Sequence, residues 1–416
     1  MKKKIVALIL VSLLLLSSCS FSRKKVDFDY FHDNFNPLSV IGNSNMSAAA
    51  LTQAYLLAKT ADPTLDSVAF IDYEAYTNGV GIADITYQED ENSVLYTVKI
   101  GDNVKFSNGK DVTAKDAAFT LYACCDIDYS GWAPVKYGTI DGMVEYQYGC
   151  EEAADVVITD EQIENELKNP SEKTKAYLLE RVIFPVLEEE YRWVEHLYTD
   201  PAYKGTEAEE LIKENPTANE LFAYYYLVDG KVARVHDKDA LIKDIAEMYV
   251  TDIDLLSTIY GSDLKESAKE QAKRALTETA LEGMSVTKTE HIRGINIIDE
   301  KTLTVRLNDK SEDALEKALG VFVVPFDVYG KECSFDGVGF DIDIASVLDN
   351  TLEPIGAGPC VFEGYKKGKG VKLSKNKHYF KEEPFECKVT LVETGNSQTP
   401  PDTTYFTVYD ERLIVK

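Results

Sequence analysis

The sequence lacks the residue patterns that carry most enzymatic chemistry. It has no Gly-x-Ser-x-Gly nucleophile elbow, and Gly356-x-Gly358 is followed by Pro359 and lacks the third glycine of a dinucleotide-binding turn. Gly368-Lys-Gly370 does not have the spacing of a phosphate-binding loop. The histidines form no His-Glu-x-x-His or similar metal-binding spacing; there are five, at positions 32, 196, 236, 291 and 378. We therefore expect no catalytic residues, no metal and no cofactor.

Basic residues and cysteines are both scarce. The chain has 44 lysines and arginines against 71 acidic residues, a net charge of −27, so it should repel nucleic acid and anionic lipid head groups. Seven cysteines in 416 residues are too few for a disulfide scaffold. The adjacent Cys124 and Cys125 would make a strained pair, which leaves two alternatives open: a bridge from one of them to Cys150, or a bridge between Cys360 and a neighbour.

A long hydrophobic run is also missing. Residues 5–16 are apolar except for Ser12 and follow three lysines, and this run is shorter than the about 20 residues that span a bilayer. The pattern predicts a signal peptide over residues 1–18. Leu16-Ser17-Ser18-Cys19 resembles a lipobox, so Cys19 is the predicted lipid anchor, acylated with chains such as palmitate, and residues 19–30 the tether.

The most informative stretch runs from Val94 to Ala123. Val94 to Ile100 alternates apolar and polar residues, which predicts a half-buried strand. Asn108-Gly109 then supplies a tight turn. Thr113 stands three residues before Asp116, so it should cap a helix that buries a set of apolar residues: Ala117, Phe119, Leu121 and Tyr122.

This stretch resembles the oligopeptide- and dipeptide-binding lipoproteins of bacterial ABC importers. Phe106-Ser-Asn-Gly-Lys110 and Thr113-Ala-Lys-Asp116 match that family's strand, turn and capped helix. Gly294 to Leu307 resembles the family hairpin, and Glu353 to Tyr379 resembles its Gly-x-Gly-Pro turn and second hairpin. The resemblance implies an α/β fold of the periplasmic-binding-protein-like type II, peptide-binding class, with a mixed sheet and helices.

Elsewhere the predicted elements are less distinctive. Apolar spacing predicts a helix over 48–59, and Val321 to Pro325 predicts a buried strand closed by proline. Lys388 to Glu393 resembles a further strand of the family. In the family, the loop after the capped helix presents an aromatic ring to the peptide, so the ligand-binding candidates here are Trp132 first, then Tyr129 and Tyr137. Packing of these rings beneath the loop is the alternative interpretation.

From residue 150 to residue 290 the sequence changes character. Strand patterns give way to acidic, amphipathic helical patterns, where the resembled family usually has a short connection. This large helical insertion is either a solvated appendage, the interpretation we favour, or a lid or partner-docking surface that uses Tyr224-Tyr225-Tyr226.

The resemblance also implies a domain organisation with a missing part. The family continues after residue 393 into a second large lobe, whereas only a short tail follows here, so either the chain is truncated, which we favour, or a second polypeptide supplies the other wall of the cleft. The predicted units are a first lobe over 31–60 and 310–393, a middle domain over 61–309 that contains the insert 150–290, and a truncated tail over 394–416.

Together these features predict the substrate-binding component of an ABC importer, fixed by lipid to the extracytoplasmic face of the cell membrane. Its partners would be a permease and a peptide or other small solute, and no nucleic acid. The alternative is a surface lipoprotein with an interaction or structural role through its helical insert, in which transport has been lost. An exported hydrolase with an unrecognised site is a third, less favoured interpretation.

Overall fold

The computed structural model describes most of the chain between residues 24 and 414. The described ranges are 24–28, 31–40, 43–57, 81–131, 139–199, 207–226, 237–260, 263–311, 314–349, 354–380, 389–393, 407–409 and 412–414. The predicted signal peptide, Cys19, Trp132 and Tyr137 lie outside these ranges. Within them, no helix is long and apolar enough to cross a membrane, and no cluster of side chains has the composition of a metal site.

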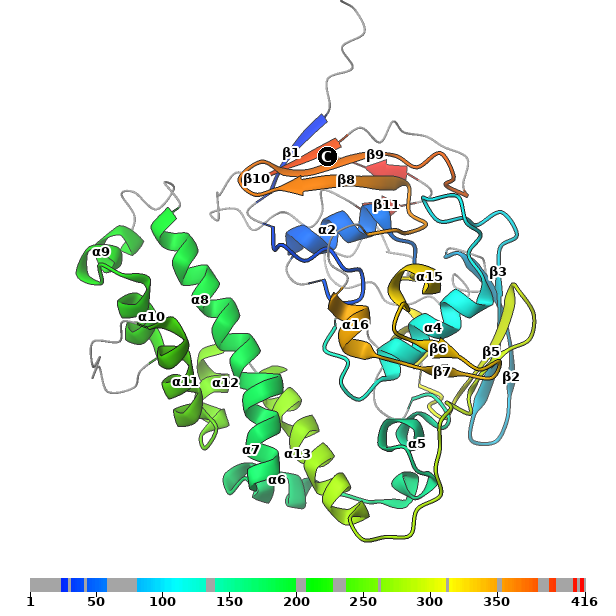
Figure 1. Cartoon of the computed structure of the whole chain (residues 1–416), viewed down its shortest axis with the longest axis horizontal. Coiled ribbons are helices and arrows are strands. Elements are labelled where there is room, and N and C mark those ends of the chain that lie inside the picture. The colour runs from blue at the N-terminus through cyan, green and yellow to red at the C-terminus, as the bar shows by residue number, and fades with distance from the viewer. Residues whose placement is uncertain are drawn as a thin grey trace, which may run out of the picture.

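Two four-stranded sheets form the α/β part of the molecule, which we call the body (Figure 1). The first has the order β1-β10-β9-β8, in which β1 pairs parallel with β10 and the other neighbours are antiparallel. The second has the order β2-β3-β5-β4 and is antiparallel throughout. The strands are β1 (Lys24–Phe28), β10 (Val389–Glu393), β9 (Gly370–Lys375), β8 (Cys360–Lys366), β2 (Ala83–Glu89), β3 (Val94–Ile100), β5 (Thr302–Leu307) and β4 (Ile295–Ile297).

Short helices and hairpins complete the body. Helix α2 packs against β8, and α4 packs against β4 and β5 (Figure 1). Most of their buried side chains join one large core with the second sheet. The remaining elements are α2 (Asn43–Thr52), α4 (Ala114–Cys125), α5 (Met143–Tyr148), α14 (Ala314–Leu319), α15 (Phe326–Tyr329), α16 (Ile344–Asp349), β6 (Ser334–Phe335), β7 (Phe340–Asp341), β11 (Thr407–Tyr409) and β12 (Arg412–Ile414).

The predicted capped helix is confirmed in detail. The Thr113 hydroxyl accepts a hydrogen bond from the Asp116 amide, and the Asp116 carboxylate accepts from the Thr113 amide at 2.9 Å. The same carboxylate accepts from the Phe326 amide at 2.9 Å, so it also ties α4 to α15. Gly109 has a φ of 88°, as the predicted turn requires. Because the Ser107 amide donates to the Gly356 carbonyl at 2.8 Å, this motif and the Gly-x-Gly-Pro turn are direct neighbours.

Three expectations needed correction. The helix predicted over 48–59 ends at Thr52, and the strand predicted at 321–325 is a single bridge between Tyr55 and Phe322. The two errors have one cause. The Leu56 amide donates to the Val321 carbonyl and the Leu57 amide to the Leu319 carbonyl, so the helix does not extend through these two leucines. The third is β1, which begins inside the segment predicted as a tether over 19–30 and joins the first sheet.

The insert forms a separate helical unit beside the body (Figure 1). Its buried residues make their own core, which shares no residue with the core of the body. Its helices are α6 (Asp160–Lys168), α7 (Glu172–Leu178), α8 (Phe184–Thr199), α9 (Glu207–Glu214), α10 (Ala218–Tyr226), α11 (Lys238–Tyr249), α12 (Ile253–Tyr260) and α13 (Asp263–Leu281), with a 3-10 turn at Glu151–Asp155 and a π-helical turn at Leu179–Ile183.

The chain enters and leaves the insert through two segments that lie side by side, which we call the neck. Cys150 and Lys288 form an antiparallel bridge. The Glu151 amide donates to the Thr287 carbonyl at 3.0 Å, and the Thr289 amide donates to the Gly149 carbonyl at 3.0 Å. The two ends of the insert are therefore fixed to each other next to α5.

Candidate functional site

The loop after α4 carries the described ligand-binding candidate, Tyr129. Its hydroxyl donates to the Leu38 carbonyl at 2.7 Å, and its ring packs against the core of the body. A Cβ atom on Gly131 would lie 1.9 Å from the Leu38 carbonyl oxygen and 2.2 Å from the Tyr129 hydroxyl, so only glycine fits this close approach. The structure thus shows Tyr129 joining the loop to residues 31–40. Trp132 and Tyr137 lie outside the described residues.

Residues 36–39 form a turn that links the Tyr129 loop to helix α16. The Asn36 side chain is fully buried, and its amide donates to the Val347 and Leu348 carbonyls at 2.7 and 3.1 Å. Its carbonyl oxygen accepts from the Leu38 amide at 2.9 Å. One buried side-chain amide therefore forms hydrogen bonds with the backbone of two segments that are more than 300 positions apart. These bonds fix α16 beside the turn.

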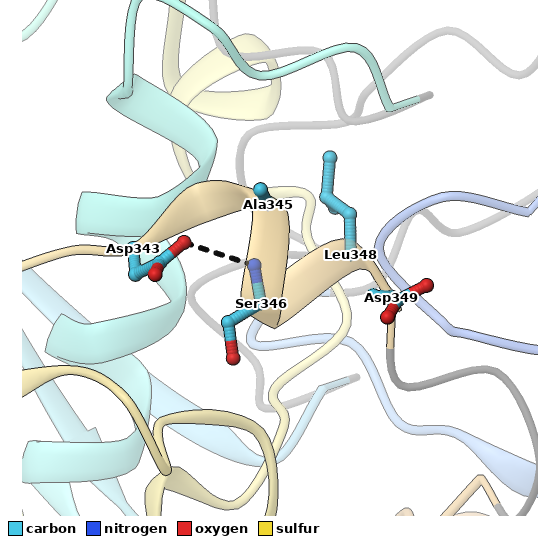
Figure 2. Close-up of a pocket in the computed structure, with 5 residues that line it drawn as sticks. All are labelled: Asp343, Ala345, Ser346, Leu348 and Asp349. Atoms are coloured by element: carbon cyan, nitrogen blue, oxygen red, sulfur yellow. Dashed lines mark hydrogen bonds between the residues drawn. The ribbon is translucent and has the colours of Figure 1, made fainter.

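An open hollow of about 500 Å³ lies on α16. Its lining residues are Asp343, Ala345, Ser346, Leu348 and Asp349. Figure 2 shows the Asp343 carboxylate accepting a hydrogen bond from the Ser346 amide at 3.0 Å, with Asp349 at the other end of the helix. This hollow, the turn 36–39 and the Tyr129 loop make up the candidate site. No sequence pattern indicated the part contributed by α16, because its residues match no motif.

The insert contacts this site through charged side chains. The Asp128 carboxylate lies 2.7 Å from the Arg274 guanidinium and 3.1 Å from that of Arg181, an arrangement that we call the arginine clasp. Arg181 also donates to the Asp128 carbonyl at 3.3 Å. The two arginines come from α13 and the π-helical turn, so the insert holds the residue that directly precedes Tyr129.

The surroundings of Arg274 in the clasp favour its charged form. Burial lowers the pKa of Arg274, but hydrogen bonds to Asp128 and Glu278 outweigh it and leave the pKa above its ordinary value. The Arg274 guanidinium also lies 4.3 Å from the centre of the Tyr177 ring. Arg274 therefore stays fully charged at any pH at which the protein folds.

A second polar contact joins the insert to residues 31–40. His32 Nε2 lies 3.3 Å from the Glu189 carboxylate on α8. Burial lowers the pKa of His32 more than the nearby Glu189 and Asp33 raise it, and Arg192 lowers it further. The imidazole is therefore predominantly neutral at pH 7. With the clasp, this contact gives the insert two polar links to the body, one beside Tyr129 and one at His32.

The cysteines resolve the alternatives left by the sequence. Cys124, Cys125 and Cys150 are buried free thiols, so neither of the adjacent cysteines is bridged to Cys150. Cys360, the first residue of β8, is disulfide-bonded. Burial raises the pKa of Cys124 to about 12, so this thiol is not a nucleophile.

Part of the chain matches a protein-family model. Residues 81–235 match the model described as bacterial extracellular solute-binding proteins, family 5, middle region. This segment is similar to the family 5 solute-binding proteins. The proteins that the model describes are extracellular, and the described elements of this chain combine helices with a mixed sheet and an antiparallel sheet, as the predicted α/β class requires. The match runs past residue 150 into helices that we expected to lie outside the family pattern. No curated protein matches the sequence.

Solved structures of peptide-binding proteins align with the chain at low similarity. The ABC transporter substrate-binding protein CtaP from Listeria monocytogenes is 12% identical, with 90% of this chain and 41% of that chain covered and a TM-score of 0.38. Lactococcal OppA, solved with an endogenous peptide, is 13% identical, with 89% and 41% covered and a TM-score of 0.41. An oligopeptide-binding protein from Borrelia burgdorferi is 12% identical, with 92% and 45% covered and a TM-score of 0.38. The chain spans less than half the length of each.

Proposed function

We propose that this chain is the membrane-anchored, peptide-binding component of an ABC importer. The observation that carries the proposal is the family 5 segment, in which the predicted strand, Asn-Gly turn and capping box are all built from the expected residues. The protein captures a short peptide and delivers it to a permease, without catalysing a reaction. The disulfide at Cys360 is consistent with an oxidising, extracytoplasmic compartment.

Within this proposal, Trp132 is the first ligand-contacting residue and Tyr129 and Tyr137 are the next. The support is positional, because Tyr129 lies between the arginine clasp and the turn 36–39, and Trp132 follows three residues later. An aromatic ring at this place covers a peptide backbone without selecting its side chains. Such a site accepts peptides of varied sequence.

Thermal unfolding of the full chain with a library of di- to pentapeptides tests peptide binding. A ligand at about 100 times its Kd stabilises the native state by about 2.7 kcal/mol, which raises the melting temperature by several degrees. Trp132→Ala should abolish the shift, and the matched variant Tyr87→Ala, which removes a partly exposed ring of β2, should keep it. If no peptide shifts the transition, this chain does not bind peptides by itself.

Metabolic labelling with palmitate tests the lipid anchor. The wild-type protein should incorporate the label and sediment with membranes, whereas Cys19→Ser should lose both properties, because its sulfur is the proposed attachment point. Cys333→Ser, which changes a free thiol within the body, serves as the control. Label that persists in Cys19→Ser would contradict the anchor.

A further inference from the structure

Three aromatic rings gather on the surface of the insert. Trp193 on α8 and Tyr224 and Tyr225 on α10 have exposed fractions of 36%, 57% and 37%. The ring centres of Trp193 and Tyr225 are 6.1 Å apart, and those of Tyr224 and Tyr225 are 5.7 Å apart. Helices α8 and α10 lie side by side in Figure 1. We call these three residues the aromatic patch.

The core of the insert does not need these rings. Neighbouring aromatic residues on the same helices, Tyr191, Phe222 and Tyr226, are buried and stack on one another. The Tyr226 hydroxyl donates to Glu190, so the third tyrosine of the predicted Tyr224-Tyr225-Tyr226 group belongs to the core. Large aromatic side chains left on a surface are over-represented where proteins bind partners.

The charge around the patch selects the kind of partner. Residues 150–290 hold 32 acidic and 16 basic residues, so the insert carries a net charge of −16 out of −27 for the chain. Glu189 and Glu190 lie one helical turn from Trp193, and Glu220 lies one turn from Tyr224. The one cation beside Trp193 among the described residues of α8, Arg192, is 3.6 Å from Glu189 and is offset by it. The patch therefore favours a cationic partner.

The spacing of the rings favours a partner in an extended conformation. Cations bind over aromatic faces, and the chain already shows this pairing where Lys238 lies 4.4 Å from the Tyr191 ring centre. Alternate side chains of an extended peptide point the same way and recur about every 6.6 Å. That repeat is close to the separations of 5.7 and 6.1 Å between the rings.

We propose that the aromatic patch binds extended peptides with a lysine or arginine at alternate positions, as a site separate from the Tyr129 loop. The proposal rests on the proposed peptide-binding function and deepens it, because it assigns a cationic class of peptide to the insert. The acidic surface attracts such a peptide from solution, and the rings hold it through its alternate side chains. Binding at the patch weakens as salt concentration rises.

The two tryptophans of the chain make the test site-specific. Trp132→Phe leaves Trp193 in the patch as the only tryptophan, and Trp193→Phe leaves Trp132 in the candidate ligand loop. Titration of the full-length Trp132→Phe protein with the peptide Lys-Gly-Lys-Gly-Lys should change the Trp193 fluorescence saturably. Gly-Lys-Lys-Lys-Gly has the same composition without the alternation and should bind several-fold more weakly, and Glu-Gly-Glu-Gly-Glu should not bind.

Variants and competing ligands complete the test. In the Trp132→Phe background, Tyr224→Ala should weaken binding about two- to fivefold, the range of an exposed cation–π contact, and Tyr87→Ala should leave it unchanged. Equal binding of the two lysine peptides, equally tight binding of spermine, or a response to a neutral oligosaccharide would each overturn the proposal. A response of Trp132 without one of Trp193 would overturn the patch and support the proposed function, and the reverse would support the patch alone.

Discussion

The body and the insert are built on different physical principles. In the body, strands pair residues that are far apart in sequence, and buried polar side chains such as Asn36 join distant segments. In the insert, neighbouring amphipathic helices bury their apolar faces against one another. The fold of the body therefore depends on contacts between residues distant in sequence. The fold of the insert depends on a repeated spacing of apolar residues along its helices.

The largest expected effects test whether the two cores are independent. Phe119→Ala should destabilise the body by about 3–5 kcal/mol, because a fully buried ring that packs against Phe326 and Phe340 is removed. Phe222→Ala should destabilise the insert by a similar amount. Hydrogen exchange resolved by mass spectrometry should show faster exchange in the mutated unit alone. Faster exchange throughout the chain after either substitution would mean that the two cores unfold together.

The arginine clasp should couple the two units more weakly. Asp128→Asn removes the charge that faces Arg181 and Arg274 and should cost about 1–2 kcal/mol, less than a fully buried pair because solvent reaches the carboxylate. We expect faster hydrogen exchange in residues 126–131, with Asp155→Asn, an exposed position at the end of the 3-10 turn, as the control. A double-mutant cycle with Arg274→Gln isolates the pair, and a coupling energy of zero would remove the clasp as a link.

The capping box should matter only within the body. Thr113→Ala removes the side-chain acceptor of the Asp116 amide and should lower the free energy of unfolding of the body by about 1 kcal/mol. Thr217→Ala is the matched change in the insert, where Thr217 and Glu220 form the same reciprocal bonds. Urea denaturation of the two variants measures both effects. If Thr113→Ala lowered the free energy of unfolding as much as Phe119→Ala does, the Thr113 side chain would do more than cap the N-terminus of α4.

The smallest effect concerns pH. Because burial holds the pKa of His32 below 6.5, the unfolded chain takes up a proton before the folded chain does as the pH falls. The contribution of neutral His32 to stability is thus complete above pH 6.5 and decreases below it, by at most about 1.4 kcal/mol per pH unit. Melting temperatures at pH 7 and pH 5 should differ less for His32→Gln than for the wild type. An unchanged difference would show that His32 titrates alike in both states.

The sequence predicted best what local chemistry determines. Thr113, Asp116 and Gly109 lie within eight residues, and their spacing alone indicates a turn and a capped helix, which the structure confirms. The same holds for Val94 to Ile100, whose alternation matches its burial. The family segment was predicted from these signals.

The sequence could not predict contacts that depend on distant pairing. Arg181 and Arg274 lie 53 and 146 positions from Asp128, and in so acidic a chain no carboxylate can be singled out as their partner. The prediction of a helix over 48–59 was wrong for the same reason. The amides of Leu56 and Leu57 donate to carbonyls of residues 321 and 319 rather than to carbonyls one turn earlier in the chain. The position of α16 in the candidate site depends on the hydrogen bonds of the buried Asn36 amide. No local sequence pattern indicates that this side chain is buried against α16.

The neck has a consequence for how such a molecule diversifies. Because the Glu151 and Thr289 amides bond across it, the chain departs from the body and comes back at one place. The stretch of 135 residues between Glu151 and Thr287 can be gained, lost or exchanged as one unit without shifting the register of any strand. The same joint is a point at which a reporter domain can be grafted.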